Sequence, residues 1–419
     1  MARTGFRRSI ATLSTAALAA ALALSGCSWS FDTADGTGSA AGSGRVNHDL
    51  YSNSSAVSAN GSAYVFFGDS TTDRLRVGTS SDGATFTYQD IDGFGLGSSA
   101  GRDGSSRLGN SYVSAIAIDN AVHVYYNDDK YNLRHATLTP SGWVFETLDG
   151  PGSSGVRGSD STLWTATHPF EAINNAGSPE IFYEMTDNAG GKNRLRHAWT
   201  WSGNWYFETL DGFSSTAGNG SIQTIAGGDP AATVVNGVEH VVYIDRNLNK
   251  CRHGWYTNGA WHFEALSIVC NERPEAVNFD NQLHLFTAEG DLIHLWGDGL
   301  GTPFKQEILD GAGGDGGRIN QFIHGFISAY NVAGEQHVFY FDYDNKVLRH
   351  GSFDRKLGAW KLESLDGPGT ETQGKGRWNK TLYAYRQIAV TLLGRTLHIW
   401  YMGETGWAAL RHAAWAPRG

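Results

Sequence analysis

Short stretches of alternating polar and apolar residues recur along most of the chain, separated by Gly-rich turns. One of these recurring stretches begins with His and ends in aromatic residues. Its copies are His123-Val-Tyr-Tyr126, His240-Val-Val-Tyr243, His284-Leu-Phe286, His337-Val-Phe-Tyr340 and His398-Ile-Trp-Tyr401, with Tyr64 and Glu180 at the His position of two further copies. Alternation with a period of two residues is typical of β-strands, so the pattern predicts an all-β protein.

A second pattern follows each of these stretches. It reads Leu-Arg-His, a turn, and then Trp-x-x-Glu, which in most copies ends in Leu-Asp-Gly. It occurs at 133–150, 195–212, 251–264 and 348–367, with weaker copies at 75–93 and 292–311 and a half-copy at 410–413. A short strand of small residues precedes each unit. Each unit therefore has four strands, and neighbouring units lie roughly 40 to 60 residues apart.

Four-stranded units at this period predict a β-propeller, and we count seven blades. The seventh blade has no outermost strand near the C-terminus, so we expect the N-terminal segment Arg45 to Tyr51 to supply it and close the ring. Closing a ring in this way removes exposed strand edges. The propeller is expected to span 45–419.

The N-terminus has the features of an export signal. Three Arg residues precede an apolar run at 10–24 that is too short to span a membrane. The run ends in Leu24-Ser-Gly-Cys27, which resembles the lipobox of bacterial lipoproteins. The resemblance implies a signal peptide at 1–26, a diacylated Cys27 and a protein anchored outside the cytoplasm in the cell envelope. An ordinary secretory signal is the alternative, and the export route stays open.

Composition narrows the set of partners. Residues 27–44 are mostly Gly, Ser, Ala, Thr and Asp, which predicts a flexible linker. The formal net charge of −10 argues against nucleic acid and against broad contact with anionic lipid, so membrane attachment is expected through the lipid alone. With Cys27 lipidated, Cys251 and Cys270 flank one predicted hairpin, which favours a disulfide over two free thiols.

Residues present in nearly every blade are most simply part of the scaffold. We expect the repeated Arg and the repeated Glu to pair across each hairpin. The repeated His residues occur once per blade and are therefore spread round the ring, so they predict no metal site, and nothing in the sequence predicts a cofactor.

An alternative is a sugar site at each blade interface. Over roughly residues 54 to 419 the repeat resembles the bacterial and fungal β-propeller lectins of the fucose-binding type, whose blades also have a Tyr-rich strand, a polar strand and a Trp after a Gly turn. The resemblance implies that aromatic faces between blades stack on sugar rings. The corresponding residues are Trp143, Trp205, Trp261 and Trp360.

Function is also expected where the blades differ. Aligning the blades on their innermost strands brings together polar and aromatic residues that differ from blade to blade: Asn53, Tyr112, His168, Asp229, Arg273, His324 and Arg386, with Glu275 close by. These residues predict a glycan site at the mouth of the central channel, and the Arg residues suit an acidic sugar.

Two further classes of function stay open. Propeller polysaccharide lyases and sialidases resemble this ring in using His, Tyr and Arg around the channel mouth, so the alternative is a lyase or glycosidase acting on an acidic sugar. The sequence assigns no catalytic residue and leaves open whether the protein is an enzyme. A third class is an envelope scaffold that binds other proteins.

Overall fold

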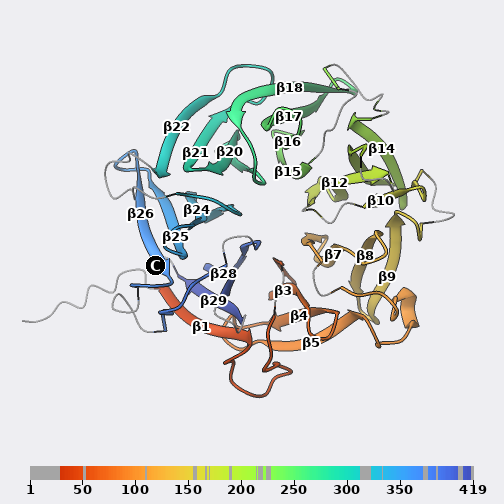
Figure 1. The fold of residues 1–419 in the computed structure, drawn as a ribbon, viewed down its shortest axis with the longest axis vertical. Helices are drawn as coiled ribbons and strands as arrows, with labels where there is room; N and C mark the ends of the chain where they lie inside the picture. Colours follow the sequence, from red (N-terminus) through yellow and green to blue (C-terminus); the bar gives the residue numbers. More distant parts are fainter. Residues whose placement is uncertain are drawn as a thin grey trace, which may run out of the picture.

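The computed structural model describes residues 29–50, 53–108, 111–153, 158–165, 168, 170–187, 191–213, 215, 220–222, 228–311, 322–332, 334–370, 376–383, 386–403 and 409–416. These residues form seven antiparallel sheets arranged as blades round a common axis (Figure 1). The predicted seven-bladed β-propeller is therefore confirmed. The segment 1–26 that is predicted to be a signal peptide, and Cys27, lie outside the described residues.

Strands are numbered along the chain, and each blade is given from its innermost to its outermost strand. Blade one comprises β2 (Ser54–Ala59), β3 (Ser62–Asp69), β4 (Arg74–Ser80) and β5 (Thr87–Gly93). Blade two comprises β6 (Val113–Ile118), β7 (Ala121–Asn127), β8 (Leu133–Thr139) and β9 (Gly142–Asp149). Blade three comprises β10 (Leu163–Thr165) and β11 (Glu171–Asn175), which both pair with β12 (Ser178–Asp187), then β13 (Arg194–Trp201) and β14 (Asn204–Gly212).

The remaining blades follow the same order. Blade four comprises β15 (Gly228–Val235), β16 (Val238–Asp245), β17 (Lys250–Thr257) and β18 (Ala260–Val269). Blade five comprises β19 (Glu275–Phe279), β20 (Gln282–Glu289), β21 (Asp291–Gly297) and β22 (Lys305–Gly311). Blade six comprises β23 (Ser328–Val332), β24 (Glu335–Asp342), β25 (Val347–Asp354) and β26 (Ala359–Asp366). Blade seven comprises β27 (Ala389–Leu393), β28 (Thr396–Gly403), β29 (Ala409–Trp415) and β1 (Trp29–Gly36).

The ring is closed by the N-terminal strand, as predicted, but by a different segment. Strand β1 pairs with β29 from Trp29 opposite Trp415 to Gly36 opposite Ala409. Residues 45–51, which the sequence analysis assigned to this strand, follow it instead. The linker predicted for 27–44 is accordingly wrong for 29–36, because that stretch is the outermost strand of blade seven.

The apolar core lies between blades. One buried cluster joins Phe66 and Val77 of blade one to Val124 and Phe145 of blade two, and similar clusters fill other blade interfaces. Within the described part of the chain, no helix is long and apolar enough to cross a membrane.

Buried ionic contacts also tie neighbouring blades together. The Asp of each Leu-Asp-Gly segment accepts hydrogen bonds from a Tyr and an Arg of the next blade, a set that we call the Asp–Tyr–Arg clamp. For example, Asp149 is bonded to the Tyr183 hydroxyl at 2.6 Å and to Arg196 Nη2 at 3.0 Å. The other clamps are Asp92 with Tyr126 and Arg134, Asp211 with Tyr243 and Arg252, Asp310 with Tyr340 and Arg349, and Asp366 with Tyr401 and Arg411.

The interface between blades four and five has no such clamp, and it carries the disulfide. In blade four Ser267 takes the place of the Asp of the Leu-Asp-Gly segment, and Thr287 and Ile293 replace the Tyr and the Arg in blade five. Cys251 and Cys270 form a disulfide, with their Cα atoms 5.0 Å apart. The predicted disulfide is confirmed in this structure, and both sulfur-bearing residues pack in an apolar cluster with Leu283 and Leu285.

Candidate functional site

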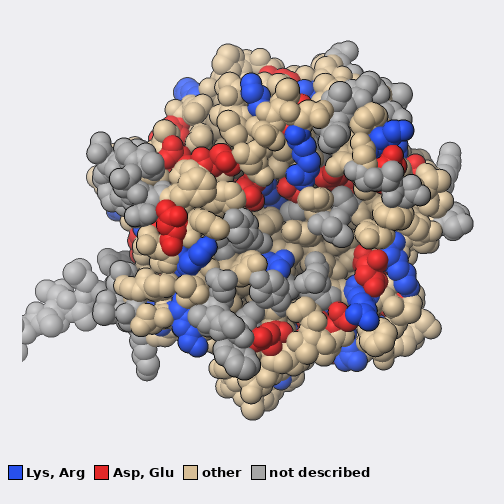
Figure 2. Space-filling view, in the orientation of Figure 1, with Lys and Arg blue, Asp and Glu red and all other residues tan. Residues whose placement is uncertain are grey.

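The candidate site lies at one end of the ring, where the chain enters each innermost strand. We call this end the mouth. The innermost strands of neighbouring blades contact one another all round the ring, so the residues that precede them converge. The predicted site residues occupy these positions: Asn53, Tyr112, His168, Asp229, Arg273, His324 and Arg386. In the face shown in Figure 2, acidic and basic side chains meet round the centre of the ring.

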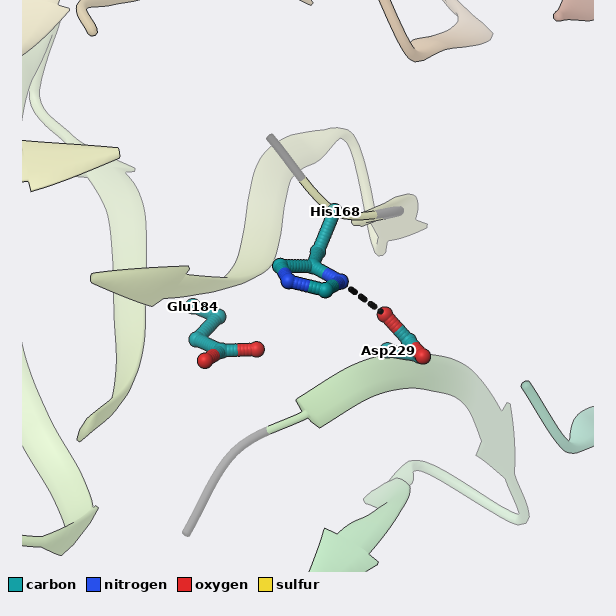
Figure 3. Close-up of side chains that lie close together, drawn as sticks. All are labelled: His168, Glu184 and Asp229. Carbon is teal, nitrogen blue, oxygen red and sulfur yellow. Dashed lines mark hydrogen bonds and ion pairs between the residues drawn. The ribbon is translucent and has the colours of Figure 1, made fainter. Parts of the chain in front are cut away.

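His168 belongs to a cluster with two carboxylates (Figure 3). Its Nδ1 atom lies 3.1 Å from Asp229 Oδ1, and Glu184 of β12 lies beside both residues. Arg246 completes the cluster, with Nη2 at 3.3 Å from Asp229 and 3.5 Å from Glu184 Oε2. Although burial opposes a charge on His168, its hydrogen bond to Asp229 and the attraction of that carboxylate raise the pKa of His168. The Arg246 guanidinium supplies a cation here, which balances the charge of the two carboxylates.

Arg273 occupies the centre of a second cluster. It forms ion pairs with Glu171 of β11 and, at 3.7 Å, with Glu275 of β19, and its Nε donates to the Pro230 carbonyl at 3.3 Å. Burial raises the pKa of Glu275 to about 7, against the attraction of Arg273. Arg273 is therefore bound by two carboxylates of the protein. These ion pairs occupy the guanidinium that the sequence analysis considered suited to an acidic sugar.

A third group joins the remaining predicted residues. Glu272 Oε1 lies 3.4 Å from His324 Nε2. Burial, together with repulsion from Asp229 and Glu289, raises the pKa of Glu272 to about 7. Burial also raises the pKa of Tyr112. The negative charge of Asp229 raises it further, whereas the positive charge of Arg386 lowers it.

The Tyr112 ring lies 6.3 Å from that of Phe326, which adds an aromatic surface to the mouth. Below it, a cavity of about 210 Å³ runs between the innermost strands and is lined by Glu171, Arg273 and Glu275 among others. The structure therefore brings the predicted residues into one polar region. Whether they bind a ligand stays a prediction.

Sequence reasoning missed Glu184, Arg246, Glu272 and Glu289. The sequence did carry a signal for one of them, Glu184. Position 184 corresponds to Gly68 in blade one and Phe341 in blade six, so a Glu there breaks the repeat at a buried position. Glu289 and Arg246 lie at or just after the end of a second strand, and the alignment on innermost strands did not extend to these positions.

The blade interfaces show how the repeated polar residues are used. In blade two His123 Nδ1 contacts His135 Nε2 at 3.0 Å, and His135 Nδ1 contacts Glu146 Oε1 at 2.7 Å. The same carboxylate accepts the indole N–H of Trp205 from blade three at 3.2 Å. The predicted Arg–Glu pair across each hairpin is therefore wrong, because the Glu bonds to His and Trp while the Arg bonds to the Asp of the preceding blade.

The four Trp residues of the interblade alternative differ in their surroundings. Trp205, Trp261 and Trp360 each donate to the Glu of the preceding blade, and the Trp261 side chain is almost fully buried. Trp143 instead lines a cavity of about 390 Å³ with Tyr64, Gln89 and Leu138. Four of the other blades place two His and a Glu at these positions, and in blade one they are replaced by Tyr64, Val77 and Gln89. The His–His–Glu hydrogen bonds are therefore missing from blade one, and a cavity lies there instead.

Comparisons with known proteins agree on the fold. No protein-family model matches the chain, and no curated protein matches it in sequence. The polysaccharide lyase Uly1 is 8% identical over 88% of this chain and 90% of its own, with a TM-score of 0.51. A mutant of the Aleuria aurantia lectin AAL in complex with Fucalpha1-6GlcNAc is 17% identical over 75% of this chain and 96% of its own, with a TM-score of 0.49. The Hadza microbial sialidase Hz136 is 12% identical over 77% of this chain and 68% of its own, with a TM-score of 0.47. The likeness to Uly1 is one of fold, and none of the three assigns a ligand to this chain.

Proposed function

We propose that this protein is a glycan-binding β-propeller, held on the outer side of a cell membrane by a lipid on Cys27, and that the mouth binds the glycan. The observation that carries the proposal is a contrast within the molecule. Repeated polar side chains at the blade interfaces bond to one another, as His135, Glu146 and Trp205 do. The mouth residues instead differ from blade to blade while remaining polar.

The side chains at the mouth match the chemistry of a sugar. Carboxylates accept hydrogen bonds from hydroxyl groups, guanidinium groups donate to ring and hydroxyl oxygens, and aromatic faces pack against C–H groups. Tyr112 and Phe326 supply the aromatic surface. The cavity between the innermost strands adds a concave surface that is largely polar, lined by Glu171, Arg273 and Glu275 and by residues such as Ser114 and Gln387.

The charges favour a neutral or amino-bearing glycan. The carboxylates that interact at the mouth outnumber the guanidinium groups. They are Glu171, Glu184, Asp229, Glu272, Glu275 and Glu289, set against Arg246, Arg273 and Arg386. Burial raises the pKa of Glu272 and Glu275 to about 7, so these two carboxyls are partly protonated near neutral pH and do not set up a strong negative field. A sugar carboxylate would still have to compete with Glu171 for Arg273, so we replace the acidic ligand of the sequence analysis with a neutral or basic one.

A glycan array tests this proposal. The full chain carrying Cys27→Ser is screened together with Tyr112→Ala and Asp229→Asn, and Trp205→Phe serves as the interblade control. We expect neutral or amino-sugar glycans to bind the parent and the control, and to bind the two mouth variants at least about tenfold more weakly, a difference of roughly 1.4 kcal/mol. Equal binding by all four proteins would contradict the mouth as the site. Shortened products from the bound glycans, seen by mass spectrometry, would support the lyase or glycosidase alternative.

One observation favours a second candidate, an interblade sugar site at a single interface. The cavity beside Trp143 offers an aromatic side chain, Tyr64 and the Gln89 amide between blades one and two. Trp143→Phe in the same array separates the two candidates. Loss of glycan binding in this variant alone would assign the ligand to the interface of blades one and two.

The anchoring part of the proposal rests on the Leu24-Ser-Gly-Cys27 segment. Cell fractionation of the Cys27→Ser variant tests it, because the variant cannot receive the lipid. We expect the parent in the membrane fraction and the variant either released or retained as an uncleaved precursor. Identical membrane association of both, with the signal peptide removed from both, would contradict lipidation.

A further inference from the structure

Blade three departs from the other blades at its contact with blade four. In five blades a His on the second strand contacts a His on the third strand, as His240 contacts His253 at 3.1 Å. Blade three keeps the second of these residues, His197, but has Glu180 in place of the first. Glu239, on β16 of blade four, lies beside them. One imidazole therefore meets two carboxylates where five other blades have a pair of imidazoles.

The atoms of this cluster are placed like the ligands of one ion. His197 Nε2 and Glu180 Oε2 lie 3.4 Å apart as an ion pair, and neither atom has any other hydrogen-bond partner. Both side chains are buried, with 5% and 7% of their surface exposed. One ligand atom each from Glu180, His197 and Glu239 can be chosen so that all three lie within 4.8 Å of one another. Bonds of about 2.0–2.2 Å at tetrahedral angles would put neighbouring ligand atoms roughly 3.3–3.5 Å apart.

The surrounding residues hold the three side chains in this arrangement. The Asn175 amide donates to Oε1 of Glu180 at 3.0 Å and to Oε1 of Glu239 at 2.6 Å, which fixes one oxygen of each carboxylate. His197 Nδ1 contacts Glu208 Oε1 at 3.1 Å. A carboxylate on the far nitrogen of a His is the usual outer contact of a metal-binding imidazole, because it orients the ring and makes the other nitrogen a better ligand.

The charges of the surrounding residues also favour a bound cation. Three carboxylates, from Glu180, Glu208 and Glu239, surround the single imidazole of His197, and among the described residues no Lys or Arg forms an ion pair with any of the three. Against burial, the hydrogen bonds of His197 to Glu180 and Glu208 raise the pKa of the imidazole to about 9, so without a metal a protonated His197 balances one of the carboxylates. A divalent cation would displace that proton and place two positive charges between the carboxylates. The cluster at the mouth differs, because the Arg246 guanidinium lies among His168, Glu184 and Asp229.

We propose that Glu180, His197 and Glu239 bind a divalent transition-metal ion between blades three and four. Mixed nitrogen and oxygen ligands in this number favour Zn²⁺ over Ca²⁺ or Mg²⁺, which prefer oxygen alone. Three protein ligands leave the fourth position to water. The site ties the second strands of two blades together at a point where the interface has no His pair.

Isothermal titration calorimetry with Zn²⁺ tests the proposal, using the full chain with Cys27→Ser after treatment with a chelator. We expect one equivalent of Zn²⁺ to bind and the melting temperature to rise with Zn²⁺ concentration. Glu180→Gln and Glu239→Gln each remove a ligand and should weaken binding by more than about 100-fold. Glu208→Gln keeps the ligands and should weaken it by about 10- to 100-fold.

Glu264→Gln is the matched control, because Glu264 contacts His253 as Glu208 contacts His197 but lies next to a complete His pair. It should leave Zn²⁺ binding unchanged. Circular dichroism checks that each variant folds, and Glu239, which is only half-buried, keeps the test available if Glu180→Gln does not fold. No Zn²⁺ binding by the parent, or equal binding by the parent, Glu180→Gln and Glu239→Gln, would overturn the proposal.

Discussion

Arg273 forms an ion pair with Glu171 that joins blade five to blade three across blade four. The same side chain contacts Glu275 and donates to the backbone of Pro230 in blade four. Three innermost strands are therefore held together by one guanidinium. Arg273 is buried and its two carboxylate partners are partly buried, so the mouth is set by fixed contacts within the protein before any ligand binds.

The first prediction concerns Glu275, whose pKa rises from 4.5 to about 7 on folding because it is buried. Between these two values the folded protein holds a proton that the unfolded chain releases. The contribution of Glu275 to the free energy of unfolding should thus fall as pH rises from about 4.5 to 7, by at most ~3 kcal/mol. Urea denaturation at several pH values should show a flatter profile for Glu275→Gln than for the parent. Parallel profiles would contradict the shift.

The buried His pairs should have the opposite effect. Burial, together with the neighbouring His350, lowers the pKa of His337 to about 3, so the folded state keeps this ring neutral. Its contribution to stability is present above about pH 6.5 and is lost as pH falls towards 3. In acid-denaturation curves, His337→Gln should lose less of its stability between pH 6.5 and 4 than the parent. An unchanged pH dependence would mean that His337 is not held neutral.

The Asp–Tyr–Arg clamp should matter for stability and not for binding. Arg196→Met leaves the fully buried Asp149 without its cation and should lower the free energy of unfolding by about 3–5 kcal/mol. The control is Arg355→Met, because Arg355 and Asp280 form an exposed pair worth at most about 1 kcal/mol. Chemical denaturation measures both. If Arg196→Met lost glycan binding while keeping full stability, the clamp would instead belong to a ligand site.

Removing the disulfide should loosen one interface. The double variant Cys251→Ala with Cys270→Ala should be less stable by about 2–4 kcal/mol. Amide hydrogen exchange should show the loss of protection first in β18 and in the neighbouring strands of blade five, because no clamp joins these two blades. Uniform loss across all seven blades would show that the disulfide does not act locally.

The last prediction concerns ring closure. Deleting residues 29–36 exposes the edge of β29 and removes the partner of His412, which contacts Asp32 at 2.8 Å. The shortened chain should melt at a lower temperature and aggregate, because an open strand edge pairs with other chains. A chain that starts at Trp29 is the control and should match the parent. Scanning calorimetry and light scattering distinguish the two outcomes.

Much of the fold was predictable because each blade repeats the same contacts. The closing strand was missed although it carries the repeat: Trp29-Ser-Phe-Asp32-Thr-Ala-Asp35-Gly36 corresponds to Trp143-Val-Phe-Glu146-Thr-Leu-Asp-Gly150. Asp32 contacts His412 as Glu146 contacts His135, and Asp35 pairs with Arg76 as the other clamp residues pair with their Arg. Three replacements by small or shorter residues, Ser30 for Val144, Asp32 for Glu146 and Ala34 for Leu148, gave this segment the composition of a linker.

The site was predictable in outline only. Alignment of the blades placed His168, Asp229 and Arg273 at one end of the ring, since residues at equivalent positions of symmetric blades converge. It gave no information on which side chains meet, because the partners come from other strands. Glu184 lies on a second strand, and Glu171 reaches Arg273 from two blades away. Sequence spacing within one blade does not show such contacts.

The closing strand also determines how a lipid on Cys27 would orient the molecule. Trp29 begins β1 only two residues after Cys27, so a lipid on Cys27 would be linked to the folded domain by a very short segment. Innermost strands start at the mouth and each following strand reverses direction, so β1, the fourth strand of its blade, starts on the opposite face. The face opposite the mouth would rest against the lipid headgroups, and the mouth would open away from the bilayer toward the surroundings of the cell.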